Sequence, residues 1–160
     1  GSQGELYPDD GDPPGDRLMR LLVSACLMGL CTRYDGNANE DRGVLALAPQ
    51  HVLYPVCPEQ LGGLPTPRPP CEIVGERVVN RLGEDLTQAF SKGAFEALKV
   101  CRLCGCEAAV LKRNSPSCGK GMIYNGTFSG KLSAGDGVFA ALLQASSIPV
   151  YGEDEIQNIE

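Results

Sequence analysis

Short apolar runs alternate with one long amphipathic segment along most of this chain. Continuous apolar residues predict strands, and the expected strands are 18–25, 51–56, 107–111 and 148–151. A small strand at 77–79 is expected to be a hairpin arm or an edge. Apolar residues at helical spacing predict one long helix and two shorter ones, at 84–104, 43–49 and 137–145. Asp136 is expected to cap the last helix, because a carboxylate there can accept its first free N–H groups.

The order of these elements indicates the fold. Strands that alternate with helices favour an α/β domain with a mostly parallel sheet and helices on both faces, a three-layer, Rossmann-like arrangement in a single domain. Residues 123–132 resemble a hairpin. The proline-rich segment Pro58–Cys71 is expected to be an irregular loop, because proline cannot continue a helix or a sheet. Residues 1–16 are expected to be a flexible tail or tag remnant.

Charge and cysteine content narrow the function. The net charge of -6 over 160 residues disfavours a surface for nucleic acid or for an anionic membrane. No apolar run approaches the roughly 20 residues that cross a bilayer. Eight cysteines would suit a disulfide-rich secreted domain, but the length and the periodic core pattern favour reduced thiols and a cytoplasmic location.

Three cysteines follow predicted strands. Cys26 comes after the run 18–25, Cys57 after 51–56, and Cys118 lies in the loop that follows 107–111. Ligand sites of parallel sheets gather beyond the carboxyl ends of the strands, so these thiols can converge on one point. Three thiolates without a nearby histidine suit an iron–sulfur cluster or a soft metal. A [4Fe-4S] cluster held this way leaves one iron open; zinc and three unconnected buried thiols are the alternatives.

The other cysteines give weaker signals. Cys31 lies in the same loop as Cys26 and is a candidate fourth ligand, whereas Cys71 has no evident partner. The spacing of Cys101, Cys104 and Cys106 is typical of metal and redox sites, but the predicted helix places the first two among apolar neighbours. Packing is therefore the favoured role for this group.

Polar residues near the three thiols could perform chemistry. Glu59 is two residues from Cys57 and could act as a general base for water, or be an ordinary loop carboxylate. Ser115 and Ser117 could orient water or substrate, or serve turn hydrogen bonds. In the first loop, Tyr34 could stack on a planar ring and Asp35 could accept its N–H groups. Lys112 and Arg113 could offset the negative charge of a cluster. His51 is the single histidine, and a structural role is favoured for it.

Several motifs together resemble the DUF523 family, which includes the thiouracil desulfidases. These motifs are Val23–Gly29, Arg33–Gly36, Pro55–Pro70, Leu111–Gly119 and Gly126–Lys131. The resemblance covers nearly all of residues 19–152. One position departs from the family: a cysteine often stands directly before the Arg-Tyr-Asp-Gly motif, where this chain has Thr32, with Cys31 one residue earlier.

The resemblance implies a cofactor, ligands and a reaction. It implies that residues 17–160 form an iron–sulfur desulfidase domain whose [4Fe-4S] cluster, with one open iron, is held by Cys26, Cys57 and Cys118. It implies Glu59 and Ser115 as the acid/base pair. The expected reaction is the non-redox conversion of 2- or 4-thiouracil and water to uracil and hydrogen sulfide. Alternatives are desulfuration of 4-thiouridine in tRNA or nucleosides, and a non-catalytic iron–sulfur or zinc protein.

Overall fold

A four-stranded sheet forms the centre of the molecule, which a computed structural model describes over residues 17–159. The strand order is β2-β1-β5-β8 and all three pairings are parallel, which confirms the mostly parallel sheet. The strands are β1 (Arg20–Ser24), β2 (Val52–Val56), β5 (Ala108–Leu111) and β8 (Val150–Gly152). The tail expected at residues 1–16 lies outside the described residues.

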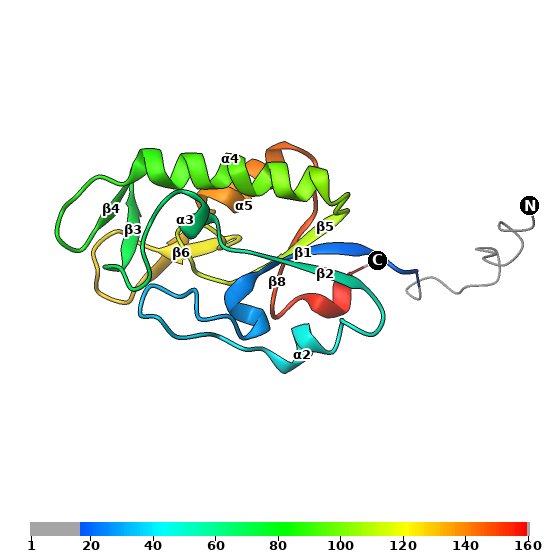
Figure 1. Cartoon of the computed structure of the whole chain (residues 1–160). Coiled ribbons are helices and arrows are strands. Elements are labelled where there is room, and N and C mark those ends of the chain that lie inside the picture. Colours follow the sequence, from blue (N-terminus) through cyan, green and yellow to red (C-terminus); the bar gives the residue numbers. More distant parts are fainter. Residues whose placement is uncertain (1–16, 160) are drawn as a thin grey trace, which may run out of the picture.

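Helices cover both faces of this sheet, as expected for a three-layer domain (Figure 1). One face carries α4 (Thr87–Leu103) and α5 (Val138–Ala145). The other face carries short elements, namely η1 (Ala25–Met28), α2 (Arg42–Leu45) and η2 (Ile156–Asn158). The α/β fold predicted from the sequence is therefore confirmed, with a second helical layer that is much thinner than the first.

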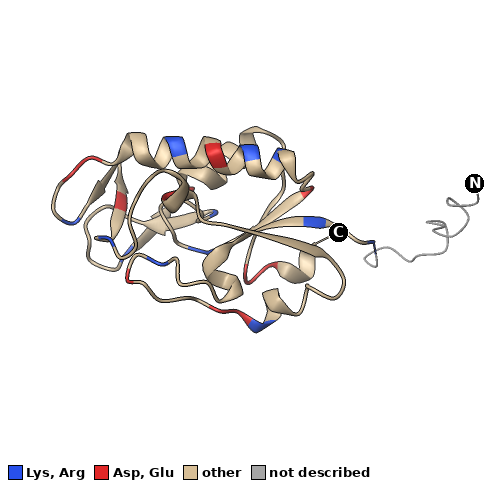
Figure 2. Ribbon diagram, viewed as in Figure 1, with Lys and Arg blue, Asp and Glu red and all other residues tan. Residues whose placement is uncertain are grey.

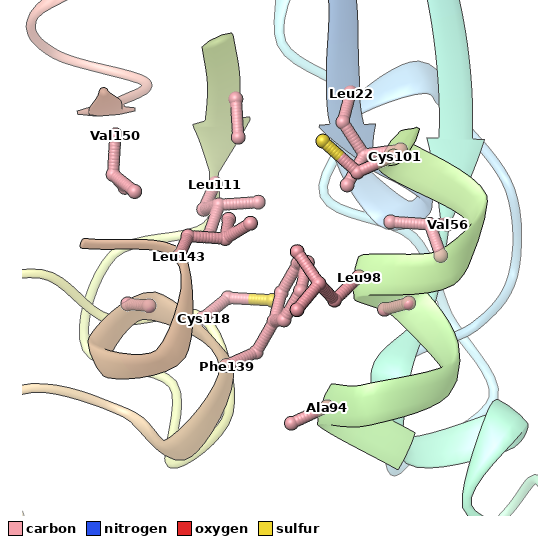
Figure 3. Packing of buried hydrophobic residues seen from close by; sticks show 13 residues of the cluster. Leu22, Val56, Ala94, Leu98, Cys101, Leu111, Cys118, Phe139, Leu143 and Val150 are labelled. Carbon is pink, nitrogen blue, oxygen red and sulfur yellow. The ribbon is translucent and has the colours of Figure 1, made fainter. Parts of the chain in front are cut away.

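The apolar run of β1 is buried on both sides. Leu22 packs with α4 and α5, whereas Leu21 and Val23 pack against the short elements of the opposite face, and all three are fully buried. Figure 3 shows Leu22 beside Cys101 of α4. Because successive side chains of a strand point to opposite faces, a strand covered on both sides must be apolar at every position.

The expectation of an irregular loop over Pro58–Cys71 was wrong at both of its ends. The segment begins with a one-turn helix, α3 (Pro58–Leu61), in which Pro58 occupies the first turn. Proline is compatible with that position, because the N–H it lacks would have no partner inside the helix. The segment ends where β3 (Cys71–Val74) pairs antiparallel with β4 (Arg77–Asn80).

The hairpin expected at residues 123–132 is present as β6 (Met122–Tyr124) and β7 (Leu132–Ala134), which pair antiparallel. The expected cap of α5 was wrong. Gly137 precedes that helix, and the carboxylate of Asp136 instead accepts a hydrogen bond from the Gly121 N–H at 2.7 Å. Asp136 therefore stabilises the entry to the hairpin.

Two glycines let α3 lie directly on α4. A Cβ atom at Gly93 would overlap the carbonyl oxygen of Pro58, and a Cβ at Gly62 would overlap the carbonyl oxygen of Ala89. The backbones of the two helices are therefore in contact, which only glycine permits. This contact fixes α3, and with it the adjacent Cys57, relative to the core.

Replacing Gly93 with alanine should destabilise the protein. In an exposed helix Gly→Ala stabilises by about 1 kcal/mol. Here the added methyl group meets backbone atoms that cannot move independently, so we expect a net loss of roughly 1–3 kcal/mol in the free energy of unfolding, measured with urea. Lys92→Ala, at the exposed neighbouring position, should change it by less than about 0.5 kcal/mol. A Gly93→Ala protein as stable as the parent would contradict the close packing of α3 on α4.

Candidate functional site

The three cysteines that follow strands come together at one edge of the sheet. β2, β1 and β5 are neighbours and run in the same direction, so their carboxyl ends lie side by side. Cys57 directly follows β2, Cys26 lies in η1 after β1, and Cys118 lies in the loop after β5. All three line one cavity of about 410 Å³. This volume falls within the range typical of cofactor and small-molecule sites.

The three thiols lie in a sheltered environment. Cys118 is 5% exposed, and burial raises the pKa of its thiol to about 12, against the opposing effect of hydrogen bonds from Ser24 and Ser117. Burial likewise raises the pKa of Cys26 and of Cys57. The charges of Cys57 and Cys26 each contribute to the raised pKa of Cys118, so the three sulfurs are close enough to interact.

Donors and cations face these sulfurs. The Asn39 side-chain amide donates to Cys26 Sγ at 3.7 Å, and Lys112 also lowers the pKa of that thiol against the effect of burial. The backbone N–H of Gln60 and the guanidinium of Arg68 likewise lower the pKa of Cys57 against the effect of burial. These groups would stabilise the thiolate forms that metals require.

The cavity is basic although the chain is acidic. Figure 2 shows both signs of charge interspersed along α4. In contrast, five of the seven charged residues that line the cavity are basic, namely Arg33, Arg68, Arg81, Lys112 and Arg113, and the other two are Glu59 and Glu72. An iron–sulfur cluster bound by three thiolates carries net negative charge, so this lining suits it.

The donor set fits an iron–sulfur cluster better than a single ion. The strand ends bring three thiols to this cavity, and Cys sulfur is the usual ligand of such clusters. Within residues 17–159, no group of three His, Cys, Asp or Glu side chains is arranged to hold one metal ion.

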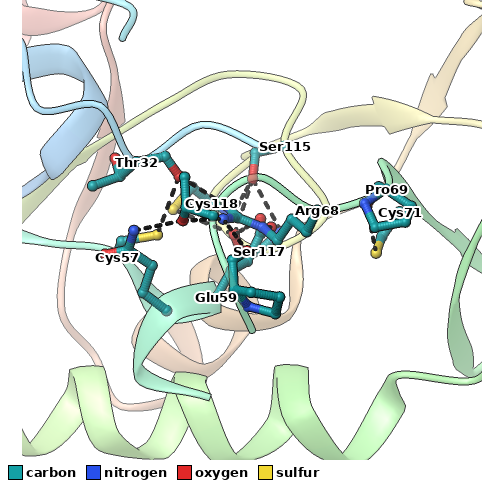
Figure 4. A network of polar contacts seen from close by, with 12 residues as sticks. Thr32, Cys57, Glu59, Arg68, Pro69, Cys71, Ser115, Ser117 and Cys118 are labelled. Carbon is teal, nitrogen blue, oxygen red and sulfur yellow. Dashed lines mark hydrogen bonds and ion pairs between the residues drawn. The ribbon is translucent and has the colours of Figure 1, made fainter. Parts of the chain in front are cut away.

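Glu59 projects from α3 into the same cavity and forms a buried ion pair. Its Oε1 accepts a hydrogen bond from Arg68 Nε at 2.9 Å, and the two side chains are only 12% and 5% exposed. The Arg68 guanidinium also donates to the Thr32 carbonyl oxygen at 2.9 Å and to Thr66 Oγ1 at 2.9 Å. Arg68 thus ties Glu59 to the loop after Cys26 and to the proline-rich loop (Figure 4).

The second carboxylate oxygen of Glu59 meets the serine loop. Ser117 Oγ donates to Glu59 Oε2 at 2.9 Å, and Ser115 Oγ lies 3.0 Å from Ser117 Oγ. Ser115 Oγ also accepts the backbone N–H groups of Ser117 at 3.1 Å and of Cys118 at 3.0 Å. The structure therefore brings Glu59, Ser115 and Ser117 together, with Ser117 in direct contact with the carboxylate.

The loop after Cys26 holds two candidate substrate-binding residues, Tyr34 and Asp35, of which only Tyr34 lines the cavity. Tyr34 lines the cavity and is 42% exposed, with the Arg33 guanidinium 5.6 Å from the centre of its ring. Asp35 is not among the lining residues. Its carboxylate is occupied by Arg33, at 3.1 and 3.0 Å, and by the backbone N–H of Asn37 at 3.0 Å.

The remaining cysteines lie in different environments. All eight cysteines are free thiols. Cys71 lines the cavity, although the sequence indicated no partner for it, and its Sγ lies 3.7 Å from the Pro69 carbonyl oxygen. Cys31 is exposed and does not line the cavity. Cys101 is fully buried in the core, where Figure 3 places it.

Sequence reasoning missed three polar residues of the site. Arg68 is the most important; it lies in the motif Pro55–Pro70, but as a single basic residue within a run of prolines it gave no indication of its role. Ser24 lies in the motif Val23–Gly29 and faces Cys118, and Asn39 faces Cys26, but neither position indicated such a contact. Their roles depend on contacts between distant loops, which no local pattern shows.

Comparison with known proteins places these observations in a family. Residues 21–155 match the family model described as 2-thiouracil desulfurase. The chain is 41% identical over 149 residues to the uncharacterized protein YbbK of Bacillus subtilis (strain 168), covering 87% of this chain and 99% of that protein. No helix in residues 17–159 is both long and apolar enough to span a membrane.

A solved structure gives a second comparison. The fold matches the [4Fe-4S]-dependent thiouracil desulfidase TudS with a TM-score of 0.81 and 44% sequence identity, over 88% of this chain and 94% of that one. These matches confirm the resemblance inferred from the motifs. The protein belongs to the 2-thiouracil desulfurase family.

Proposed function

We propose that this protein removes the sulfur of a thiolated pyrimidine, 2- or 4-thiouracil, by hydrolysis, producing uracil and hydrogen sulfide. The observation that carries the proposal is one basic cavity in which the thiols of Cys26, Cys57 and Cys118 meet a buried carboxylate and two linked hydroxyls. Family membership and the likeness to a [4Fe-4S]-dependent thiouracil desulfidase support it. The free thiols suit the reducing conditions of the cytoplasm, where we place the protein.

Cys26, Cys57 and Cys118 would hold a [4Fe-4S] cluster that keeps one iron open. When bound, such a cluster supplies a soft Lewis acid that favours binding and departure of sulfur. The protein contributes the ligands, the donors to their sulfurs, and a basic cavity lining. Lys112 acts on Cys26 and is itself held by Glu153 at 3.2 Å, which keeps its charge at the cavity wall.

Glu59 and Ser115 would form the acid/base pair. The water that attacks the ring carbon gives up a proton, and the departing sulfur needs one, so a group that takes and returns a proton serves both steps. Glu59 is held by Arg68 on one oxygen, and its other oxygen faces the serine loop. Tyr34 is placed to stack on a planar ring at the rim, and Ser117 borders the place where the substrate would lie.

Activity tests the proposal directly. Anaerobically reconstituted protein should release one sulfide per uracil formed from 2- or 4-thiouracil, measured by sulfide assay and chromatography. 4-Thiouridine and thiolated tRNA, offered in parallel, test the alternative substrates. If a protein with full iron content released no sulfide from any of them, a non-catalytic cluster protein would be the better description.

Glu59→Gln should lower kcat by about 10²–10⁴-fold without loss of iron, because the amide keeps the shape of the carboxylate but cannot take a proton. The matched control is Glu96→Gln on the exposed side of α4, which should leave kcat unchanged. Full activity of Glu59→Gln would exclude this residue as the base.

The ligand set predicts which cysteine variants lose colour. Anaerobic protein should be brown, with broad absorption near roughly 400 nm from iron–sulfur charge transfer. Cys26→Ala, Cys57→Ala and Cys118→Ala should each lose this absorption and their iron. Cys104→Ala should keep both, because Cys104 lies outside the cavity. Retention of the cluster by any of the first three variants would contradict the proposed ligands.

Arg68→Ala should destabilise the fold as well as the site. Removal of one partner of a buried ion pair leaves the other charge without compensation and typically costs about 3–5 kcal/mol. The free energy of unfolding, measured in urea, should therefore fall by about 3–5 kcal/mol. Lys99→Ala, which breaks an exposed pair with Glu96, should cost less than about 1 kcal/mol. Equal effects of the two changes would contradict a central role of Arg68.

A further inference from the structure

We infer that Ser117 is the positioning residue that couples Ser115 to Glu59, so that the three side chains work as one chain of hydrogen bonds. The inference rests on the proposed function. Ser117 Oγ stands between the other two groups, 2.9 Å from Glu59 Oε2 and 3.0 Å from Ser115 Oγ (Figure 4). From sequence, Ser117 was expected only to line the substrate site or to serve the turn.

Counting protons fixes the direction of the chain. A serine hydroxyl has one proton to donate. Ser117 Oγ lies 2.9 Å from Glu59 Oε2 and 3.7 Å from Cys118 Sγ. Cysteine sulfur is a weak acceptor, so Ser117 gives its proton to the hydrogen bond with Glu59. The bond between the two serines must then be donated by Ser115. The chain therefore runs from Ser115 through Ser117 to Glu59.

Glu59 and Ser115, the two ends of this chain of hydrogen bonds, are held in place. Arg68 fixes the far oxygen of Glu59, and the backbone N–H groups of Ser117 and Cys118 point at Ser115 Oγ. Two N–H donors aimed at one oxygen stabilise negative charge that develops on it. Ser117 is only 3% exposed, so bulk water has little access to the middle of the chain.

Local packing leaves Ser117 little freedom. A Cβ atom at Gly137 would overlap the backbone of Ser117, and one at Gly119 would lie 2.8 Å from the Ser115 carbonyl oxygen. The N–H of Phe139, in α5, donates to the Ser117 carbonyl oxygen at 2.8 Å. The serine loop is thus clamped to the start of α5, which holds both hydroxyls at fixed positions.

This chain of hydrogen bonds permits a proton transfer in which every proton has a donor and an acceptor. The Ser115 proton moves to Ser117 Oγ while the Ser117 proton moves to Glu59 Oε2, and the charge left on Ser115 Oγ is held by the two backbone N–H groups. Ser115 then takes a proton from the water whose oxygen bonds to the ring carbon. The C–S bond breaks as the new C–O bond becomes a carbonyl. The departing sulfur takes the proton on Glu59, which returns along the same path, and the second proton of the former water, which leaves the new carbonyl oxygen. The sum is thiouracil plus water to uracil plus hydrogen sulfide.

The test is a comparison of serine variants of the cluster-loaded protein. Ser117→Ala should lower kcat about 100-fold with KM within about twofold, and with unchanged iron content. Ser117→Thr keeps the hydroxyl and should recover most of the rate. The double variant Ser115→Ala/Ser117→Ala should be no slower than the slower single variant, because groups that act as a unit are not additive. The exposed control Ser133→Ala should behave as the parent.

Two results would overturn the inference. One is a parental kcat in Ser117→Ala; the other is a double variant whose loss is the product of the two single losses. If the parent itself released no sulfide despite full iron content, the proposed function would fail instead.

A second readout does not need activity. In the full-length chain, the effects of Ser115→Ala and Glu59→Gln on the unfolding equilibrium constant should be coupled by at least about threefold. This coupling should vanish in the Ser117→Ala background. Coupling that persisted there would show that Ser117 is not the link, whether or not Ser117→Ala retains iron.

Discussion

Three thiols meet because β2, β1 and β5 are neighbours that run in one direction. Parallel strands need long crossover connections, and each crossover here returns the chain to the amino ends of the strands, so that every strand ends at the same side of the sheet. The proposed ligand set therefore depends on strand order, because Cys26, Cys57 and Cys118 are spread over more than 90 residues of the chain. The contact of α3 with α4 through Gly93 then fixes the position of Cys57 and Glu59.

The electrostatics of the cavity suit the cofactor that the family implies. Burial disfavours the thiolate of Cys118, and the cavity wall opposes this effect with hydroxyls near that sulfur and with cations near Cys26 and Cys57. Arg68 links this environment to the proposed chemistry, because it lowers the pKa of Cys57 and also holds Glu59. One buried cation thus acts on both a proposed cluster ligand and the proposed acid/base group.

Sequence predicted the sheet and the three cysteines because both depend on local patterns. The apolar run of β1 could only suit a strand covered on both faces, and strand ends are where ligands gather. The short helix α3 was missed because a proline-rich segment usually excludes helices, whereas Pro58 stands at the one turn that tolerates it. Asp136 was wrongly assigned because its partner, Gly121, is distant in sequence.

The separate roles of Ser115 and Ser117 could be assigned only from the structure. Sequence suggested that Ser115 works with Glu59 and that Ser117 is secondary. The contacts place Ser117 against the carboxylate and Ser115 one hydroxyl further away. Asp35, adjacent to Tyr34 in the chain, is held by Arg33 away from the cavity. Differences of this kind depend on side-chain direction within loops, which the order of residues leaves open.

The most direct measurement is the Mössbauer spectrum of anaerobic, iron-57-loaded protein with and without 4-thiouracil. The account predicts about four irons per chain in which one differs from the other three, because three cysteines leave one iron without a protein thiolate. Addition of 4-thiouracil should change the signal of that iron alone. Four equivalent irons, or a spectrum that the substrate leaves unchanged, would contradict a three-cysteine cluster that binds the sulfur of its substrate.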